Sequence, residues 1–397
     1  MIVNERRAGL PLFHAQPVRS RIHSLLNVTC RKMLPRKTRV SLIEFFERLV
    51  FPNVVALNAQ SPAGSVAPER APADLWTREV LCPPVSVRPA PFPGSDLLPA
   101  AFAEETTFGE FAVLAIPEGA LCGNIILDRN NCPVPGLTLA RIVSSQSRRD
   151  ATMRTLPPRR IDADVVAVGN TYLDNYFHWL HDIVAAILFL PDYRDRLYCG
   201  PIRHHDQMEC LELLGIRRDQ VINLYPGECL RFNSVLAFTA PQQGHPELVR
   251  RLSRLEQETR TTPKRIYISR EDAKKRRAIS NEEELNALLE RHGFIRISFS
   301  ELPVREQIAH MRGAEAVVMP QGAAVTNMAF CSPHTKELEL YSPKFLITLG
   351  PLFARALGHT RYQAVIGAEA DPDREGATAH FRMDLGAVEA ALKAFSL

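Results

Sequence analysis

Short apolar runs alternate with amphipathic stretches along the chain after residue 100. The runs are rich in Val, Ile and Leu and end at small or polar residues, as buried strands do. The stretches between them have helical periodicity and end at Gly or Pro. The predicted strands are 111–116, 123–128, 165–169, 221–224, 234–238, 265–270, 294–299, 314–319, 337–341 and 362–365. The predicted helices are 174–190, 207–214, 247–259, 280–291, 303–312, a helix from 324 and 345–357.

This alternation is typical of a parallel sheet with helices on both faces. It divides into two halves, residues 101–245 and 246–397. We therefore expect an α/β fold with two Rossmann-like domains that face a cleft. Ligands of such sheets bind beyond the carboxyl ends of the strands.

Residues 1–100 differ from the rest of the chain. Residues 1–50 hold ten Lys or Arg and three Glu, and residues 60–100 are rich in Pro and Ala. This composition predicts a basic, Pro-rich N-terminal extension whose second part is a linker or irregular extended stretch. The basic part is either a solvated arm or an amphipathic segment that contacts anionic lipid at the inner membrane.

The overall composition is that of a globular protein, with 46% hydrophobic and 23% charged residues. A net charge of +4 over 397 residues gives no reason to expect nucleic acid as a partner. The apolar run 183–190 is too short to span a bilayer, and the N-terminus lacks a signal-peptide core. Eight scattered cysteines without a CxxC pair predict mostly free thiols in a reducing compartment. We therefore expect a cytoplasmic protein.

A turn of small residues, 320–327, lies between a predicted strand and a predicted helix. Gly322 and its neighbouring alanines let backbone amides approach a ligand, and a helix N-terminus favours a bound anion such as phosphate. An ordinary joint between a strand and a helix is the alternative. Because charged residues are expected around this turn, the sequence favours a nucleotide site.

Basic and acidic candidates follow the predicted strands. Arg270 ends one strand, and Arg276 and Arg277 come shortly after it. Guanidinium groups bind phosphate oxygens in a bidentate way and can neutralise a diphosphate leaving group without a metal. A solvated basic loop is the alternative for 274–277. Glu339, in the last strong strand, either binds ribose hydroxyls or pairs with a nearby cation.

His178 and Asp182 lie four residues apart and share one face of a predicted helix. An imidazole beside a carboxylate is a competent general base, although the aspartate could itself take the proton. A structural pair is the alternative. His178 and His181 lack the His-Glu-x-x-His pattern and a third ligand, so we expect no metal site. The chain has neither a dinucleotide fingerprint nor a Walker motif, and we expect no cofactor.

Three motifs occur in order over about residues 165–345. The first is Asn175-Tyr176-Phe177-His178-Trp179 with Asp182, and the second is Tyr267-Ile268-Ser269-Arg270 with Asp272-Ala273, Arg276-Arg277 and Asn281-Glu282. The third is Gln321-Gly322-Ala323-Ala324-Val325-Thr326-Asn327 with Phe330-Cys331, Lys336 and Glu339-Leu340. Together they resemble glycosyltransferase family 61, which includes bacterial proteins of capsular polysaccharide biosynthesis.

The resemblance implies a GT-B fold and an inverting, metal-independent glycosyltransferase. Such an enzyme moves a hexosyl or pentosyl group from a nucleotide sugar, its donor substrate, to a glycan or lipid-linked glycan acceptor. It implies catalytic roles for His178 and Asp182. On the acceptor side it implies Asn175, Tyr176 and Trp179. On the donor side it implies Arg270, Arg276, Arg277, Gln321, Gly322, Ala323, Thr326, Asn327 and Glu339.

One position departs from the family pattern, because Gln321 occupies the place of the usual histidine before Gly-Ala. Glutamine can hydrogen-bond a phosphate or a sugar, but it cannot carry charge or move a proton at neutral pH. Two functions therefore stay open. One is an active transferase, and the other is a non-catalytic component of a polysaccharide synthesis complex that binds nucleotide sugar or glycan.

Overall fold

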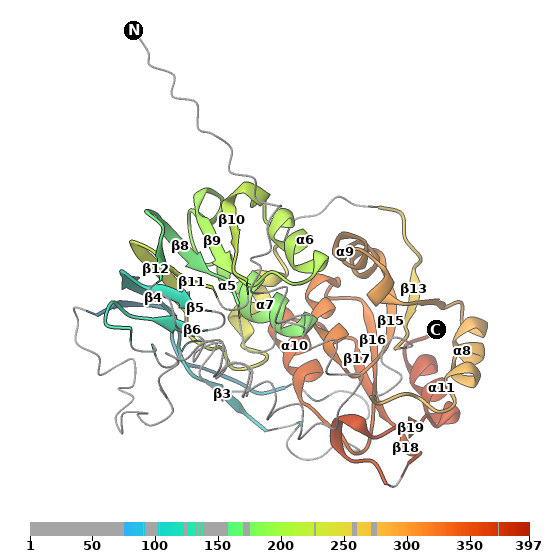
Figure 1. Ribbon diagram of the computed structural model, residues 1–397. Helices are drawn as coiled ribbons and strands as arrows, with labels where there is room; N and C mark the ends of the chain where they lie inside the picture. The colour runs from blue at the N-terminus through green and yellow to red at the C-terminus, as the bar shows by residue number, and fades with distance from the viewer. Residues whose placement is uncertain are drawn as a thin grey trace, which may run out of the picture.

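The computed structural model describes most of the chain after residue 74 (Figure 1). The described residues are 75–89, 91, 102, 104–122, 125–131, 134, 137, 158–169, 175–225, 228–255, 260–270, 276–371 and 373–397. The predicted basic segment 1–50 lies outside them, and so does most of 60–100.

The N-terminal half is organised around a mixed six-stranded sheet in the order β1-β4-β12-β8-β9-β10. β12, β8, β9 and β10 run parallel, whereas β4 is antiparallel to both β12 and β1. An antiparallel pair needs no crossover helix, and the described residues between β1 and β4 form none. The strands are β1 (Thr77–Cys82), β4 (Phe111–Pro117), β8 (Asp164–Ala167), β9 (Leu197–Gly200), β10 (Val221–Asn223) and β12 (Ser234–Phe238).

β1 and a second short strand correct the prediction of an irregular linker over 60–100. β1 pairs with β4, and β2 (Val85–Val87) pairs with β3 (Thr106–Phe108). Trp76, Cys82 and Val87 are buried. Pro83 and Pro84 fall between the two strands, where no ladder hydrogen bond is required, and Pro89 and Pro91 of the stretch that suggested a linker follow β2.

A small four-stranded sheet, β6-β5-β11-β7, lies beside the large one. Cys122 and Cys229 are directly opposite each other in this sheet and form a disulfide, although they are 107 residues apart in sequence. The expectation of free thiols is therefore wrong for this pair, because strand pairing brings the two together. Four other described cysteines are free and buried, at 82, 199, 210 and 331. The strands are β5 (Ala120–Cys122), β6 (Ile125–Leu127), β7 (Arg159–Arg160) and β11 (Cys229–Arg231).

The C-terminal half contains a five-stranded, fully parallel sheet in the order β14-β13-β15-β16-β17. The chain starts in β13, moves outward to β14, and then returns past β13 to β15. The strand order therefore reverses between β13 and β15, which is the position where ligands of doubly wound sheets bind. The strands are β13 (Arg265–Ile268), β14 (Ile295–Ile297), β15 (Ala316–Pro320), β16 (Lys336–Tyr341) and β17 (Tyr362–Ile366), with β18 (Ala368–Glu369) and β19 (Phe381–Arg382) as a separate pair.

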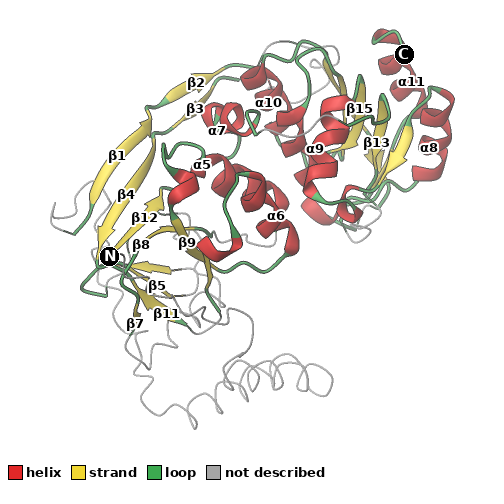
Figure 2. Cartoon of the chain, turned by 90° about the horizontal axis from the view of Figure 1, so that it is seen from above, coloured by secondary structure: helices red, strands yellow, loops and turns green. Residues whose placement is uncertain are grey.

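Helices from both halves lie between the two large sheets (Figure 2). α7 packs on α10, and α6 packs on α9. One hydrophobic cluster includes Val166 and Phe238 from the first sheet and Ile268 and Met319 from the second. The helices are α6 (His205–Leu213), α7 (Pro246–Leu252), α8 (Glu282–Arg291), α9 (Val304–Gly313), α10 (Leu349–Leu357) and α11 (Leu385–Ala394), and the short 3-10 helices are η6 (Tyr193–Asp195), η7 (Arg218–Gln220), η9 (Phe299–Glu301) and η11 (Gly376–Thr378).

In the described part of the chain, no helix combines the length and the apolar character that crossing a bilayer requires. The predicted α/β class with a parallel sheet is confirmed for the C-terminal half. The N-terminal half is mixed, since β1 and β4 add an antiparallel edge to its parallel strands.

Candidate functional site

The helix predicted over 174–190 is a single run with a π-helical segment in its middle. It consists of α4 (Tyr176–His178), η5 (Trp179–Val184) and α5 (Ala185–Ile187). The side chain of Asn175 caps the run by accepting a hydrogen bond from the Phe177 amide at 2.9 Å. π-Helical turns are rare and are often found at functional sites. Here the π segment begins directly after His178.

Asp182 accepts one hydrogen bond from each of two histidines. Its Oδ2 lies 2.8 Å from His178 Nδ1, and its Oδ1 lies 2.8 Å from His181 Nδ1. Burial raises the pKa of Asp182, but the hydrogen bonds from His178 and His181 outweigh burial and bring that pKa below its ordinary value. Asp182 is therefore a carboxylate near pH 7. Because a carboxylate only accepts hydrogen bonds, both Nδ1 atoms carry the proton.

This assignment leaves Nε2 of His178 as the basic atom of the ring. Gln243 Nε2 lies 3.4 Å from it and can donate a hydrogen bond to it. A neutral imidazole whose Nδ1–H faces a carboxylate is arranged to accept a proton at Nε2, because the carboxylate stabilises the imidazolium that forms. Gln243 was not predicted as a site residue, because it lies in a loop 65 residues after His178.

The turn of small residues follows β15 and leads into the 3-10 helix η10 (Ala323–Phe330), where an α-helix was predicted. Arg270 Nη1 donates a hydrogen bond to the carbonyl oxygen of Gln321 at 3.1 Å. A Cβ atom on Gly322 would lie 1.8 Å from that Nη1 and 3.7 Å from Arg277 Nη2. A side chain at 322 would therefore displace the Arg270 guanidinium, and two predicted donor-binding arginines meet at this turn.

The arginines of this turn repel one another. Burial, together with the charges of Arg270 and Arg276, lowers the pKa of Arg277 to about 10. The Arg277 guanidinium carbon lies 4.2 Å from the centroid of the Phe345 ring, which holds the side chain in place. Arg276 is exposed. An anion between these groups would relieve their repulsion, and guanidinium forks match phosphate oxygens.

Buried polar side chains follow three neighbouring strands at the same edge of the sheet. Ser269 follows β13, Gln321 follows β15 and Ser342 follows β16, and all three are buried. Within the described residues, Ser269 Oγ, Gln321 Oε1 and Ser342 Oγ have no hydrogen-bond partner. Unpaired buried groups of this kind call for an explanation, and a polar ligand is one. Their position directly after a strand is the sequence signal that could have identified Ser269 and Ser342.

A hydrogen bond joins the helix of His178 to the turn at Gly322. Tyr176 Oη donates to Asn327 Oδ1 at 2.8 Å, and α4 packs against η10. The adjacent Thr326 is fully buried, and its hydroxyl donates to the Ala323 carbonyl within η10 at 2.9 Å. The structure thus brings the predicted catalytic helix and the predicted donor turn side by side.

Two predicted residues are enclosed by the fold. Trp179 is buried, and its indole lies beside the Cys210 thiol. Glu339 is 1% exposed, and its Oε2 accepts hydrogen bonds from the hydroxyls of Tyr341 and Tyr362 at 2.6 Å each. A Cβ atom on Gly350, in the first turn of α10, would lie 1.9 Å from that oxygen. Glu339 therefore packs under α10, and its contact with a ribose stays a prediction, as does an acceptor contact of Trp179.

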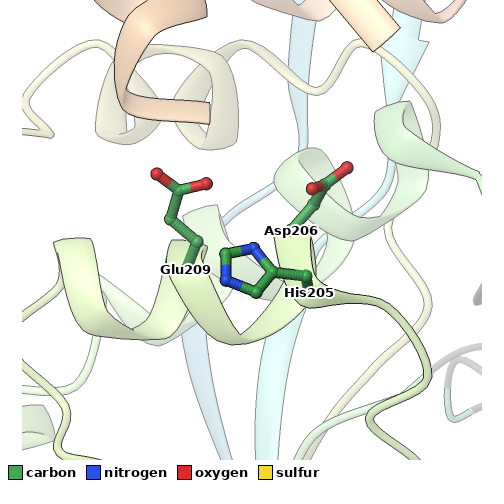
Figure 3. A group of neighbouring side chains, drawn as sticks. All are labelled: His205, Asp206 and Glu209. Atoms are coloured by element: carbon green, nitrogen blue, oxygen red, sulfur yellow. The ribbon is translucent and has the colours of Figure 1, made fainter. Parts of the chain in front are cut away.

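One possible metal-ligand group occurs among the described residues, at the start of α6 (Figure 3). The ligand atoms of His205, Asp206 and Glu209 lie within 4.8 Å of one another. Glu209, however, accepts hydrogen bonds from the Val304 amide at 2.8 Å and from Arg305 Nε at 2.7 Å. Its carboxylate is therefore engaged in capping α9, and this group does not resemble a dedicated metal site.

The comparison with protein families agrees with the three motifs. Residues 176–338 match the family model Glycosyltransferase 61. No curated protein matches the chain. The matched region starts at Tyr176 and ends within β16, so it contains the histidine pair, Arg270 and the turn at Gly322, whereas Glu339 lies just outside it. Residues 176–338 are thus similar to a glycosyltransferase family 61 domain.

Proposed function

We propose that the protein is an inverting, metal-independent glycosyltransferase of the GT-B type, with an acceptor domain over 101–245 and a donor domain over 246–397. Its donor is a nucleotide sugar, and its acceptor is a glycan or lipid-linked glycan in bacterial capsular or extracellular polysaccharide synthesis. The observation that carries the proposal is the hydrogen bond between Tyr176 and Asn327, because it joins a proton acceptor to an arginine-lined turn. We also propose a cytoplasmic location, with residues 1–50 able to reach the inner membrane.

The donor diphosphate would lie at the turn of Gly322, between Arg270 and Arg277. These guanidinium groups meet where the strand order reverses, and they carry the positive charge that a departing diphosphate needs. The buried oxygens of Ser269, Gln321 and Ser342 would take hydroxyl groups of the sugar or the ribose. Gln321 is suited to this binding role, since an amide can both donate and accept.

His178 would act as the general base. As the acceptor oxygen forms its bond to the anomeric carbon, the bond from that carbon to the diphosphate breaks on the opposite face. The proton of the acceptor hydroxyl moves to His178 Nε2, and Asp182 stabilises the imidazolium through Nδ1–H. A base placed in this way is typically worth roughly 10²–10⁴ in rate.

A panel of nucleotides and nucleotide sugars tests the donor site by thermal shift. A ligand that binds only the native state raises the Tm once its concentration exceeds Kd. We expect a nucleoside diphosphate to raise the Tm of the wild type and of Arg217→Ala, an exposed arginine of the other half, but not that of Arg270→Ala. A panel without any shift in the wild type would contradict the donor site.

Transfer from the binding nucleotide sugar then tests catalysis. We expect His178→Ala and Asp182→Asn to bind donor normally and to lose turnover. Full turnover by both variants would remove the proposed base. Donor binding by the wild type without turnover, unchanged in Gln321→His, would instead support a non-catalytic component of a synthesis complex.

A further inference from the structure

We propose that His181 is a positioning residue for the base. It holds Oδ1 of Asp182, so that Oδ2 stays on Nδ1 of His178 and Nε2 of His178 faces the acceptor hydroxyl. The inference rests on the proposed function, in which His178 takes the proton. His181 is adjacent to Asp182 in sequence and was considered from the sequence only as an unsupported metal ligand.

The position of His181 is unusual for a residue with a purely structural role. Its side chain is completely buried, and its ring stacks on Phe177 at 5.1 Å with an interplanar angle of 11°. Phe353 covers it from α10, with ring centroids 6.4 Å apart. Its Nε2 has no hydrogen-bond partner among the described residues. An apolar side chain would fill this space without burying an unpaired nitrogen, so the bond from Nδ1 to Asp182 is the contact that an imidazole adds.

That bond changes what Asp182 can do. With a donor on each oxygen, the carboxylate divides its negative charge between two rings and cannot rotate away from either of them. Without His181, Oδ1 would lose this donor, and a larger share of the negative charge would act on His178. A more strongly stabilised imidazolium releases its proton less easily. His181 therefore controls both the orientation and the basicity of the pair.

Two titratable side chains near the pair, His245 and Cys210, are neutral near pH 7, whereas charged groups lie farther out: Glu247 and Arg250 of α7 act on His245, and Asp206 and Glu209 of α6 act on Cys210. From α7, His245 faces His181, and burial lowers the pKa of His245 to about 4, with repulsion from His181 adding to the effect. From α6, the Cys210 thiol lies beside Trp179, and burial raises the pKa of that thiol. From η10, Asn327 contacts Tyr176. These surrounding groups are the same in the wild type and in variants of His181, so a change in the pH response of His178 between them reports how Asp182 is shared.

Three substitutions at one position separate positioning from packing. His181→Phe keeps the stack on Phe177 but has no donor, and His181→Gln carries its amide farther out than Nδ1. His181→Asn places an amide donor near the position of Nδ1. We expect kcat to fall about 10–100-fold in the Phe and Gln variants and to recover in the Asn variant. This is the range found when a hydrogen-bond partner that orients a functional side chain is removed.

The acid limb of the kcat/KM profile is the readout that packing alone would not move. Because His181 then no longer shares the charge of Asp182, we expect the limb to shift to higher pH in the Phe and Gln variants and to return in the Asn variant. Lower thermal stability with an unshifted limb in all three variants would overturn the inference.

A measurement without substrate separates the inference from the proposed function. In protein labelled with ¹⁵N-histidine, with signals assigned through His178→Gln, the titration of the His178 ring can be followed by NMR. We expect its midpoint at higher pH in His181→Phe than in the wild type. An equal midpoint would overturn the inference even if the wild type transfers sugar, and absence of transfer by the wild type would leave this titration as an independent test.

Discussion

At the scale of single residues, the site depends on close approaches that few side chains permit. Both oxygens of Asp182 accept hydrogen bonds, and Arg270 lies so close to residue 322 that a side chain there would displace its guanidinium. The pairing of His178 with Asp182 could be predicted from their spacing. The second partner of Asp182 could not, because the π-helical segment that begins at Trp179 changes which side chains meet.

Gly322→Ala should weaken nucleotide binding without preventing folding. The new methyl group would lie 1.8 Å from Arg270 Nη1 and would displace the guanidinium from the turn. A hydrogen bond to a charged group is worth about 1.5–3 kcal/mol, so we expect Kd for a nucleoside diphosphate to rise roughly 10–100-fold by calorimetry. Gly109→Ala is the matched control, because its nearest contact would be at 3.9 Å. An unchanged Kd in the Gly322 variant would exclude Arg270 from the donor site.

At the scale of elements, β16 carries two buried glutamates into the interior of the C-terminal half. Glu337 lies beside His359 at 2.9 Å, and Glu339 lies under the first turn of α10. Burial raises the pKa of both carboxyls, and that of Glu339 reaches about 7 even though Tyr341 and Tyr362 donate to it. The sequence places Glu339 in a strand, but it gives no sign that α10 covers it, because the contact comes from residues 10 or more positions later.

Glu339→Gln should flatten the pH dependence of stability. The folded-state pKa of Glu339, about 7, exceeds the ordinary value of 4.5, so the folded protein binds the extra proton between these values. The stability that this proton provides is complete below about pH 4.5 and is lost as the pH rises through about 7. At 1.36 kcal/mol per unit, the shift corresponds to roughly 3 kcal/mol at most.

Urea unfolding at pH 5 and pH 8 measures this effect. We expect the wild type to lose more stability between the two pH values than Glu339→Gln does, because the variant lacks the carboxyl whose pKa burial raises to about 7. Glu283→Gln, on the exposed face of α8, should behave as the wild type. Parallel pH profiles for the wild type and Glu339→Gln would show that the carboxyl of Glu339 titrates normally.

At the scale of the whole molecule, helices of one half are capped by side chains of the other. Glu209 of α6 accepts hydrogen bonds from the amides of Val304 and Arg305 at the start of α9, and it pairs with the Arg305 side chain. Alternation of strands and helices predicted the parallel C-terminal sheet, whose crossover helices follow the rule for βαβ units. The alternation could not predict the contact of Glu209 with the start of α9, which joins residues 95 positions apart.

The errors in the fold have local causes. β9, a strand of four residues, was not predicted, although the shorter β10 was. α11 was not predicted, although Asp384 provides an N-cap that accepts from two amides. β1 was not predicted because nearby prolines suggested a linker. Its partner β4 is distant in sequence, and the residues between the two strands do not indicate that they pair.

Glu209→Gln should loosen the contact between the halves. An amide oxygen can still cap α9, but it cannot carry the charge that pairs with Arg305, and its NH₂ group would be buried near the helix N-terminus. Lost caps and charged partners typically cost about 1–2 kcal/mol, and we expect a loss of this size in chemical denaturation. Glu212→Gln, on the same helix but paired with exposed Arg218, should cost less than half as much. Equal losses of stability in the two variants would show that the contact of Glu209 with α9 does not stabilise the packing of the two halves.

The polar side chains at the carboxyl edge of the parallel sheet lie just after the strands, not within them. Ser269, Gln321 and Ser342 can therefore be exchanged without changing the side chains that β13, β15 and β16 contribute to the core. Libraries restricted to these three positions should retain soluble expression while altering which activated sugar the protein accepts. The donor specificity of this protein could thus be changed by varying only these three positions.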